Sequence, residues 1–370
     1  MAEQKLIRPP VEVSYAEELA ALAENDSGAR PQNWKLSPKA VRTFILGSPK
    51  PVKYSGGTIE IKKKYYGNDA LVERSIITLT GNRGLMLVGE PGTAKTMLSE
   101  LLAAAISGTS TNTIQGTAGT TEDMIKYSWN YALLLAEGPT RRALVPSPVY
   151  IGMEKGMITR FEEITRTGAE IQDSLISIMS DKVLNVPELG DDGILFARPG
   201  FNVIGTANTR DKGVNEMSSA LKRRFNFETV MPVRDVAMEK QIIIGEVNKL
   251  ARESGVDMTA DEDIAAVLAS TYHELREGVS SLGHRIDRPA AVMSTAEAVS
   301  VCYQTMLNAY YYGGKADVRC LVENLSGAVL KESADDIEKL KSYFATVIRD
   351  KSVKEGGIWE EYYKARSLLK

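Results

Sequence analysis

One segment constrains what this 370-residue chain can fold into more than any other: the loop Gly89-Glu90-Pro91-Gly92-Thr93-Ala94-Lys95-Thr96. It follows the apolar run Leu85-Met86-Leu87-Val88, which predicts a buried strand, and it precedes a helix that we expect to begin near Met97. Small residues let successive backbone N–H groups of such a loop converge on phosphate oxygens, beside the positive end of the helix. The segment therefore predicts a P-loop in an α/β core that binds ATP or GTP.

The loop residues have separate expected tasks. Lys95 supplies a positive charge, Thr96 supplies a metal ligand, and Met97 joins the loop residues that we expect to contact the nucleotide. Ala94 stands where such loops usually have a second glycine, so we expect a backbone that accepts a methyl group there without a positive φ angle.

Apolar runs and helical patterns alternate after this loop, which predicts a parallel sheet between helices. The expected strands are Thr111 to Ile114, Met157 to Phe161, Phe201 to Thr206 and Phe227 to Val230, with a helical pattern over Ala169 to Met179. Two short apolar runs around Gly190-Asp191-Asp192-Gly193 predict a protruding hairpin over Leu184 to Phe196.

The chain outside this core divides into two further parts. Residues 1–65 carry many prolines and charges and predict an extension on the outside of the core at residues 66–231. Residues 232–370 predict a helical lid with C-terminal helices, over Val236 to Glu253, Asp261 to Leu275, Pro289 to Leu307 and Ala334 to Val347. We expect Pro289 in the first turn of its helix, and Tyr310-Tyr311-Tyr312 at a helix end packed on the core.

The overall charge gives no general attraction to nucleic acid, since the formal net charge is −3 and the isoelectric point is about 5.8. The run Lys62-Lys63-Lys64 is typical of a solvated face rather than of a phosphate-binding patch. The sequence has no apolar signal stretch and no run of about 18 apolar residues, so we expect a cytoplasmic protein without a membrane span.

Two adjacent carboxylates, Glu162 and Glu163, follow the strand that we expect to end at Phe161. Hydrolysis of a bound nucleotide requires a carboxylate near the magnesium ion and a second group that activates water. We assign Glu162 to the second coordination shell of the metal and Glu163 to water activation, because adjacent residues of a strand face opposite ways. ATP and Mg²⁺ are therefore the expected substrate and cofactor.

Several further blocks occur in the same order as in one family, and with them the chain resembles the MoxR-type AAA+ ATPases, including the CbbQ and NorQ group. The resemblance covers roughly Tyr66 to Leu307. Besides the P-loop and the acidic pair, the similar blocks are Val145 to Tyr150, Met153 to Gly156, Glu163 to Arg166, Thr206 to Thr209 and Ala220 to Phe225.

The resemblance implies roles for three more residues. Asn208 corresponds to the first sensor, which contacts the γ-phosphate and the attacking water. Arg224 corresponds to the arginine finger that reaches the nucleotide of a neighbouring subunit, with Arg223 as the alternative. Arg288, or alternatively Arg285, corresponds to the second sensor arginine at the start of a lid helix.

The resemblance also implies how such a protein works. It predicts a hexameric ring that hydrolyses ATP and acts as a chaperone-like remodeller of a protein client, or helps a metal cofactor into an enzyme. The expected partner has a von Willebrand A (VWA) domain. Inserted segments near residues 116–138 and 184–196 are the expected places of client contact.

Three other functions remain open alternatives. A nucleotide-binding scaffold would bind ATP without turnover. A motor acting on nucleic acid is disfavoured by the acidic tip of the predicted hairpin, which would repel phosphates. A small-molecule kinase could use the same loop, but it would have no use for Asn208, Arg224 or a helical lid.

Overall fold

The computed structural model describes residues 6–209, 215–329, 333 and 335–369, which form two compact units. The core unit comprises residues 9–90 and 94–231. The C-terminal unit is built mainly from the residues that follow 231. Each unit has its own hydrophobic core, and the two are described separately below.

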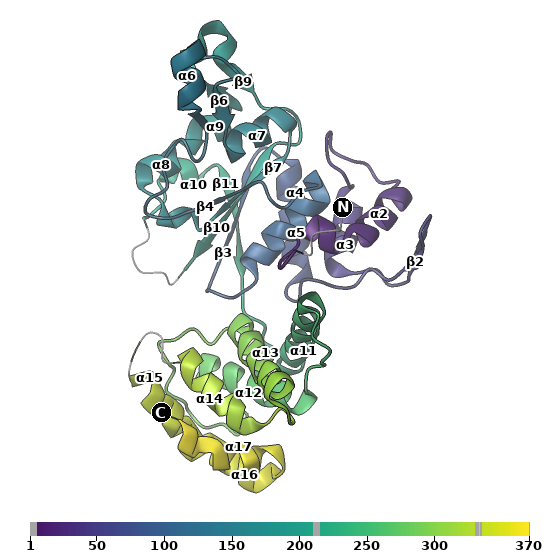
Figure 1. Ribbon diagram of the computed structural model, residues 1–370, viewed down its shortest axis with the longest axis vertical. Coiled ribbons are helices and arrows are strands. Elements are labelled where there is room, and N and C mark those ends of the chain that lie inside the picture. The colour runs from purple at the N-terminus through teal and green to yellow at the C-terminus, as the bar shows by residue number, and fades with distance from the viewer. Residues whose placement is uncertain (1–5, 210–214, 330–332, 334, 370) are drawn as a thin grey trace. The chain divides into compact units, whose positions relative to one another are not determined.

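A five-stranded parallel sheet lies at the centre of the core unit, in the order β11-β3-β10-β7-β4 (Figure 1). Its strands are β3 (Gly84–Gly89), β4 (Thr113–Gln115), β7 (Ile158–Glu162), β10 (Asn202–Asn208) and β11 (Phe225–Val230). All five expected strands are present, with ends that differ by at most two residues. The predicted α/β fold with a parallel sheet is confirmed.

Helices cover both faces of this sheet, because successive residues of a strand point to opposite faces. In β3, Leu85 and Leu87 join one hydrophobic cluster and Met86 joins another. Figure 1 shows α4 and α5 on one side of the strands and α8 and α10 on the other. The helices around the sheet are α4 (Asp69–Thr80), α5 (Lys95–Ser107), α7 (Pro148–Lys155), η1 (Ile164–Arg166), α8 (Ala169–Asp173), α9 (Leu175–Asp181) and α10 (Ser219–Lys222). The helical pattern over Ala169 to Met179 thus forms two short helices rather than one.

The N-terminal segment contributes to the hydrophobic cluster on the face of the sheet that α4 and α5 cover. It contains α1 (Val11–Ser14), α2 (Ala16–Asn25), α3 (Pro38–Leu46) and the antiparallel hairpin of β1 (Val52–Tyr54) and β2 (Gly57–Ile59). Phe44 and Ile45 of α3 are fully buried in the same cluster as Leu102 of α5. This segment is therefore a packed part of the core unit rather than an extension on its outside.

Lys64 contradicts the prediction of a solvated lysine run. Its side chain is 4% exposed, and its ammonium donates hydrogen bonds to Glu18 Oε2 at 2.5 Å and to the Phe44 carbonyl at 2.8 Å. The same ammonium lies 4.3 Å from the centre of the Phe44 ring. A buried carboxylate and an aromatic ring here compensate the charge that water would otherwise solvate.

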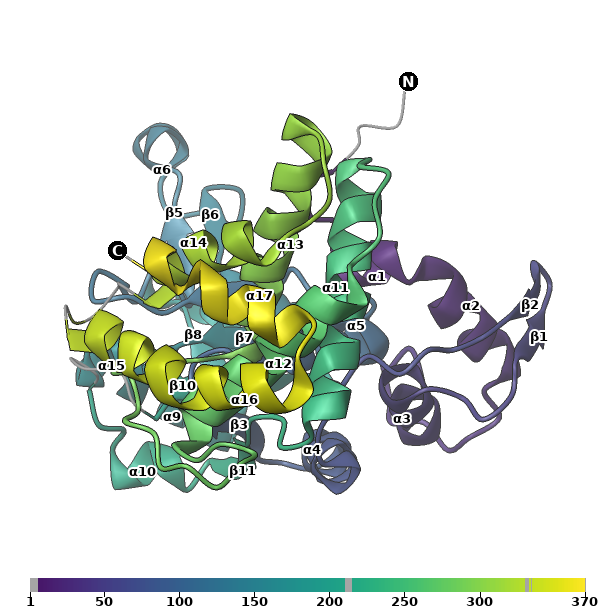
Figure 2. The same cartoon turned by 90° about the horizontal axis from the view of Figure 1, so that it is seen from below.

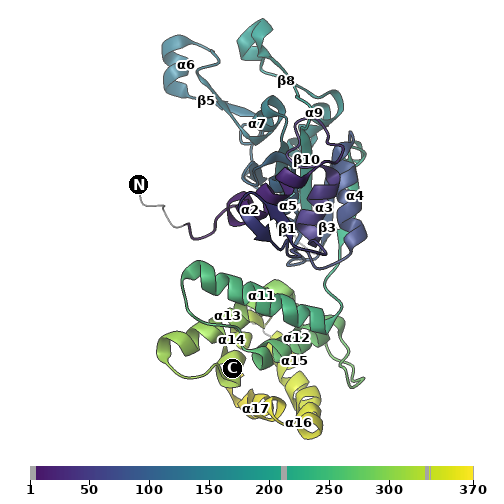
Figure 3. The ribbon, with the colours of Figure 1, turned by 90° about the vertical axis from the view of Figure 1, so that its right-hand side faces the viewer.

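Two inserted hairpins extend from the core unit, and Figure 3 shows α6 and β8 at the same end of it. One consists of β5 (Tyr127–Trp129), α6 (Tyr131–Glu137) and β6 (Leu144–Pro146), and the other of β8 (Val183–Asn185), η2 (Pro187–Gly193) and β9 (Ile194–Phe196). The predicted hairpin at 184–196 is present, but its tip is the longer 3-10 segment η2 rather than a tight turn.

The C-terminal unit is helical (Figure 2). Its helices are α11 (Val236–Ser254), α12 (Glu262–Glu277), α13 (Thr295–Tyr312), α14 (Val318–Val329), α15 (Asp335–Tyr343), the π-helical η3 (Phe344–Ile348), α16 (Arg349–Glu355), α17 (Ile358–Lys364) and η4 (Ala365–Leu368). The expected start at Ala334 lies outside the described residues. None of the helices in the described part of the chain is long and apolar enough to cross a membrane.

Two expectations about α13 are wrong. The helix begins at Thr295 rather than near Pro289, because the Ser294 hydroxyl accepts the N–H of Glu297 and caps the first turn. At its other end, Tyr310, Tyr311 and Tyr312 are 46%, 68% and 86% exposed, so this run is not packed on the core.

Candidate functional site

The carboxyl ends of three neighbouring strands bring the predicted residues of the core unit to one edge of the sheet. Asn208 of β10 pairs with Gly89 of β3, and Gly205 of the same strand pairs with Phe161 of β7. The N–H of Thr209 donates to the Gly89 carbonyl at 3.0 Å. The first-sensor candidate therefore lies beside the start of the loop, one strand away from Glu162.

The loop ends in a strained residue. Ala94 has φ 67° and ψ 23°, and α5 begins directly after it at Lys95. The expectation of a loop without a positive φ at Ala94 is therefore wrong. The left-handed conformation costs an alanine roughly 1–2 kcal/mol, and the surrounding structure must hold it there. Gly92 also has a positive φ, of 73°.

Lys95 is buried at the base of the loop, with 7% of its surface exposed. Its ammonium donates to the carbonyls of Gly89 at 3.2 Å and Glu90 at 2.7 Å. The start of α5 thus places a cation beside the N–H groups of a first helical turn. Both features attract anionic oxygens such as those of a phosphate.

The carboxylate of Glu162 is buried at this edge and accepts hydrogen bonds on both of its oxygens. Only 4% of the residue is exposed. One carboxylate oxygen, Oε2, accepts from Thr96 at 2.9 Å and from Thr206 at 2.8 Å. The other, Oε1, accepts from Ser99 at 2.6 Å and from Arg160 at 2.7 Å.

Glu163 faces differently from Glu162 for a reason other than the predicted one. β7 ends at Glu162, and Glu163 occupies a left-handed turn with φ 52° and ψ 43°. Its N–H donates to Thr206 Oγ1 at 3.0 Å, and its carboxylate, with 32% of the side chain exposed, accepts from Arg166 at 3.0 Å. The turn, rather than strand alternation, separates the two carboxylates.

Thr206 connects the two acidic residues. Its hydroxyl accepts the backbone N–H of Glu163 and donates to the carboxylate of Glu162. Such a bridge fixes one side chain relative to the backbone of the other. Arg160, Ser99 and Thr206 were not predicted as site residues, although a polar residue inside a buried strand, as Arg160 and Thr206 are, is a signal that could have found two of them.

The residues present fit a magnesium ion held with a nucleotide. Mg²⁺ prefers hard oxygen ligands and usually takes only one or two from the protein, the rest coming from phosphates and water. Thr96 and Glu162 supply a hydroxyl and a carboxylate in mutual contact. Across the described ranges, no group of three or more His, Cys, Asp and Glu side chains could hold a metal by itself.

Two adjacent arginines occupy the predicted finger position, between α10 and β11. Arg224 is half-buried and donates to Ser180 Oγ at 2.9 Å and to the Ala220 carbonyl at 2.7 Å. Arg223 is exposed. The two candidates therefore differ in how firmly their own chain holds them.

The predicted second sensor lies in the C-terminal unit. Arg288 is exposed and donates to the Glu277 carbonyl. We expected it at the start of a helix, but α13 begins seven residues later, at Thr295. Arg285, the alternative, is exposed and pairs through its backbone with Val279.

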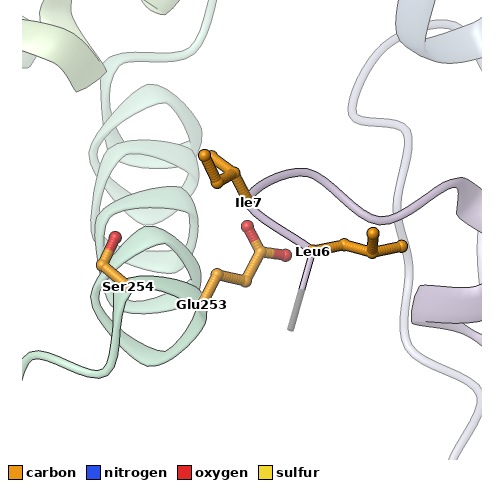
Figure 4. Close-up of a pocket in the computed structure, with 4 residues that line it drawn as sticks. All are labelled: Leu6, Ile7, Glu253 and Ser254. Atoms are coloured by element: carbon orange, nitrogen blue, oxygen red, sulfur yellow. The ribbon is translucent and has the colours of Figure 1, made fainter. Parts of the chain in front are cut away.

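A separate hollow is lined by Leu6, Ile7, Glu253 and Ser254 (Figure 4). Its two apolar side chains are 50% and 97% exposed, so it is open to solvent. None of its residues was predicted to bind nucleotide, and a single carboxylate would repel phosphates. The hollow therefore does not add to the nucleotide site.

Comparison with known proteins bears on both parts of the chain. Residues 84–225 match the AAA domain of the dynein-related subfamily, and residues 237–370 match the C-terminal domain of YehL-like AAA+ ATPases. The chain is 47% identical over 366 residues to the uncharacterized protein YehL of Escherichia coli K12, covering 98% of both chains.

More distant similarities agree with these matches. The chaperone MoxR1 of Mycobacterium tuberculosis is 27% identical over 186 residues, which are 50% of this chain and 45% of MoxR1. A crystal structure of NtrX from Brucella abortus in complex with ATP superposes with a TM-score of 0.50 at 11% identity, covering 81% of this chain and 66% of NtrX. The predicted family resemblance is confirmed: the chain belongs to the YehL-like AAA+ ATPases of the MoxR type.

Proposed function

We propose that this protein is a ring-forming motor that hydrolyses ATP with Mg²⁺ and remodels a protein client. One observation carries the proposal. At the carboxyl edge of the sheet, the carboxylate of Glu162 accepts the hydroxyl of Thr96, while the next residue turns a second carboxylate away from it. Phosphoryl transfer to water needs both groups, in two different places.

The residues of this edge have distinct proposed roles. The loop from Gly89 to Met97 binds the phosphates, with Lys95 compensating their charge. Thr96 would bind the metal, with Glu162 orienting the Thr96 hydroxyl from behind, and the metal would neutralise charge on the phosphate oxygens. Glu163 accepts a proton from the attacking water, and Asn208 orients that water from the end of the neighbouring strand. NtrX, a protein of similar fold, is described in complex with ATP.

Assembly would complete the site. An arginine supplied by a neighbouring subunit stabilises charge that develops as the γ-phosphoryl group leaves, and in related systems this is worth about 10³ to 10⁵ in rate. We assign this role to Arg224, with Arg223 as the alternative. Arg223 is a strong alternative because its side chain is exposed. Arg224 would first have to break its hydrogen bonds to Ser180 and to the Ala220 carbonyl. Arg288 remains our second-sensor assignment.

The two inserted hairpins are the proposed client-binding region. Tyr131 and Leu135 of the first and Phe196 of the second are 76%, 90% and 67% exposed. The hairpins are joined by hydrogen bonds from Tyr127 to Glu188 at 3.0 Å and from Arg141 to the Asp192 carbonyl at 2.7 Å. Exposed apolar side chains on joined hairpins suit an unfolded or flexible protein segment.

The wider setting is proposed from the family. MoxR1 carries the name chaperone, which supports remodelling of a protein or insertion of a metal cofactor as the work done. We propose a hexamer in the cytoplasm that acts with a VWA-domain partner. A motor acting on nucleic acid is not favoured, because the second hairpin carries Asp191 and Asp192 at its tip.

The test is steady-state ATP hydrolysis with magnesium as a function of protein concentration. The variants are Glu163→Gln, Arg224→Ala and Arg223→Ala. We expect turnover per subunit to rise with concentration, Glu163→Gln to lose roughly 10² to 10⁴ of it while still binding ATP, and one arginine variant to lose about 10³ or more. Nucleotide binding without turnover at any concentration would instead identify a scaffold.

A further inference from the structure

Arg160 lies in the buried strand that leads to the acidic pair, and its side chain is only 4% exposed. All three of its nitrogens donate: Nη2 to Glu162 Oε1 at 2.7 Å, Nε to Ser99 Oγ at 2.9 Å and Nη1 to the Ser110 carbonyl at 2.6 Å. A second carboxylate, Glu100, lies 3.6 Å from Nη2. The guanidinium is thus fixed on every side.

These contacts divide the two oxygens of Glu162 between different partners. Arg160 and Ser99 hold Oε1, and the hydroxyls of Thr96 and Thr206 hold Oε2. A glutamate is one methylene longer and more mobile than an aspartate, so without a second anchor its carboxylate could reach past Thr96. The bond to Arg160 removes this freedom and also neutralises the charge.

We propose that Arg160 is a positioning residue of the magnesium site. By pairing with Glu162 it keeps this carboxylate hydrogen-bonded to the Thr96 hydroxyl, and it limits how strongly the site attracts magnesium. The inference rests on the proposed function, since it concerns the metal that accompanies ATP. An arginine suits the task because it stays charged when buried and presents donors in a rigid fork.

Two substitutions separate the charge of Arg160 from its shape. Arg160→Lys keeps the positive charge and loses the fork, whereas Arg160→Gln keeps a hydrogen-bond donor and loses the charge. Removing the charge leaves a buried carboxylate unbalanced next to the metal position, and opposite charges attract strongly at short range in a partly buried site. We therefore expect nucleotide binding by the two variants to depend differently on the Mg²⁺ concentration.

The measurement is equilibrium binding of a fluorescent ATP analogue to the full-length chain, first in EDTA and then over a titration of free Mg²⁺. We expect Arg160→Gln to lower the half-saturating Mg²⁺ concentration by about tenfold, and Arg160→Lys to stay within about twofold of wild type. Arg276→Met serves as the matched control, because it removes another buried arginine that pairs with a glutamate, in the C-terminal unit. Thermal unfolding confirms that each variant folds.

The outcomes distinguish this inference from the proposed function. If the wild-type chain binds the analogue in a magnesium-dependent way but Arg160→Gln leaves the half-saturating Mg²⁺ unchanged or raises it, the positioning role is overturned and the motor stands. The positioning role is also overturned if Arg160→Gln and Arg276→Met shift it equally, since that indicates a general loss of stability. If the wild-type chain binds no nucleotide, both proposals fail together.

Discussion

The two units each bury an arginine against a glutamate, and the pairs differ in what surrounds them. In the core unit, Arg160 pairs with Glu162 at 2.7 Å, and in the C-terminal unit Arg276 pairs with Glu239 through Nη1 and Nη2 at 3.0 and 2.8 Å. Glu239 is fully buried and Glu162 is 4% exposed. Both are buried ion pairs, although Arg276 holds both oxygens of its glutamate and Arg160 holds one.

Their remaining hydrogen bonds separate them. Arg276 also donates to the carbonyls of Met293 at 2.9 Å and Val233 at 3.1 Å, which fixes the path of the chain before α13 and before α11. Glu162 accepts from three hydroxyls, two on the P-loop helix and one on the neighbouring strand, whereas Glu239 accepts from the hydroxyl of Thr295 at the start of α13. A buried ion pair therefore does not identify a site, whereas the groups that share its carboxylate do.

The largest expected effect is on the stability of the C-terminal unit. Arg276→Met leaves Glu239 buried without its cation, which costs about 3–5 kcal/mol. We expect a lower unfolding midpoint in thermal or urea denaturation, while the folded fraction binds nucleotide as the wild type does. A loss below about 1 kcal/mol would mean that water or Thr295 compensates Glu239 and that the pair is dispensable.

Acid should weaken a second ion pair of the same unit. Burial by itself raises the pKa of Glu274, but hydrogen bonds from Lys351, from the Ser281 N–H and from Tyr343 outweigh it and hold the pKa below its ordinary value. A lowered pKa in the folded state gives stability that is present above the unfolded pKa of about 4.3 and is lost as pH falls through the folded value.

Lys351→Met isolates this contribution. We expect it to cost about 3 kcal/mol at pH 7 and to flatten the loss of stability between about pH 5 and pH 3. The measurement is the urea midpoint across that pH range. An unchanged slope in the variant would show that other carboxylates produce the acid sensitivity.

A matched pair of hydroxyl deletions sharpens the comparison. Ser99→Ala removes a 2.6 Å hydrogen bond to Glu162, and Thr295→Ala removes a 2.7 Å hydrogen bond to Glu239. Each should cost about 1.5–3 kcal/mol of stability, because the acceptor is charged. We expect only Ser99→Ala to change the ratio of kcat to KM for ATP. Equal kinetic effects would remove the distinction between the two carboxylates.

The smallest expected effect concerns backbone strain in the loop. Ala94→Gly relieves the cost of a left-handed alanine but adds freedom to the unfolded chain. The balance predicts a gain of up to about 1 kcal/mol in the free energy of unfolding, with ATP affinity retained. A destabilised glycine variant would mean that the alanine methyl contributes packing which outweighs its strain.

Local patterns were sufficient to predict the sheet and which of its edges brings the proposed site residues together. A glycine-rich loop between an apolar run and a helix, and an acidic pair after another apolar run, are contiguous in sequence. Since parallel strands end at one edge of a sheet, the order of these blocks also predicts that Gly89, Glu162 and Asn208 come close together. The register of β10 with β3 and β7 agrees with this.

The wrong predictions have two causes: partners far away in the chain, and local signals that compete with one another. Lys64 looked solvated because its partners, Glu18 and Phe44, lie far away in the chain. The start of α13 was misplaced because Pro289 was preferred to Ser294, whose cap competes with it. Ala94 takes a positive φ because the turn into α5 requires it, whatever residue occupies the position.

The sequence by itself determined the fold class, the family and the edge of the sheet to which we assign the nucleotide site, because each depends on short contiguous patterns. Only the tertiary structure decided how that edge is held. Arg160 stands two residues before Glu162 on the same strand, but Ser99 and Thr206 come from a helix and a neighbouring strand, and they meet Glu162 only after the sheet has formed. A side chain's partners depend on which elements become neighbours, and that is a property of packing rather than of spacing along the chain.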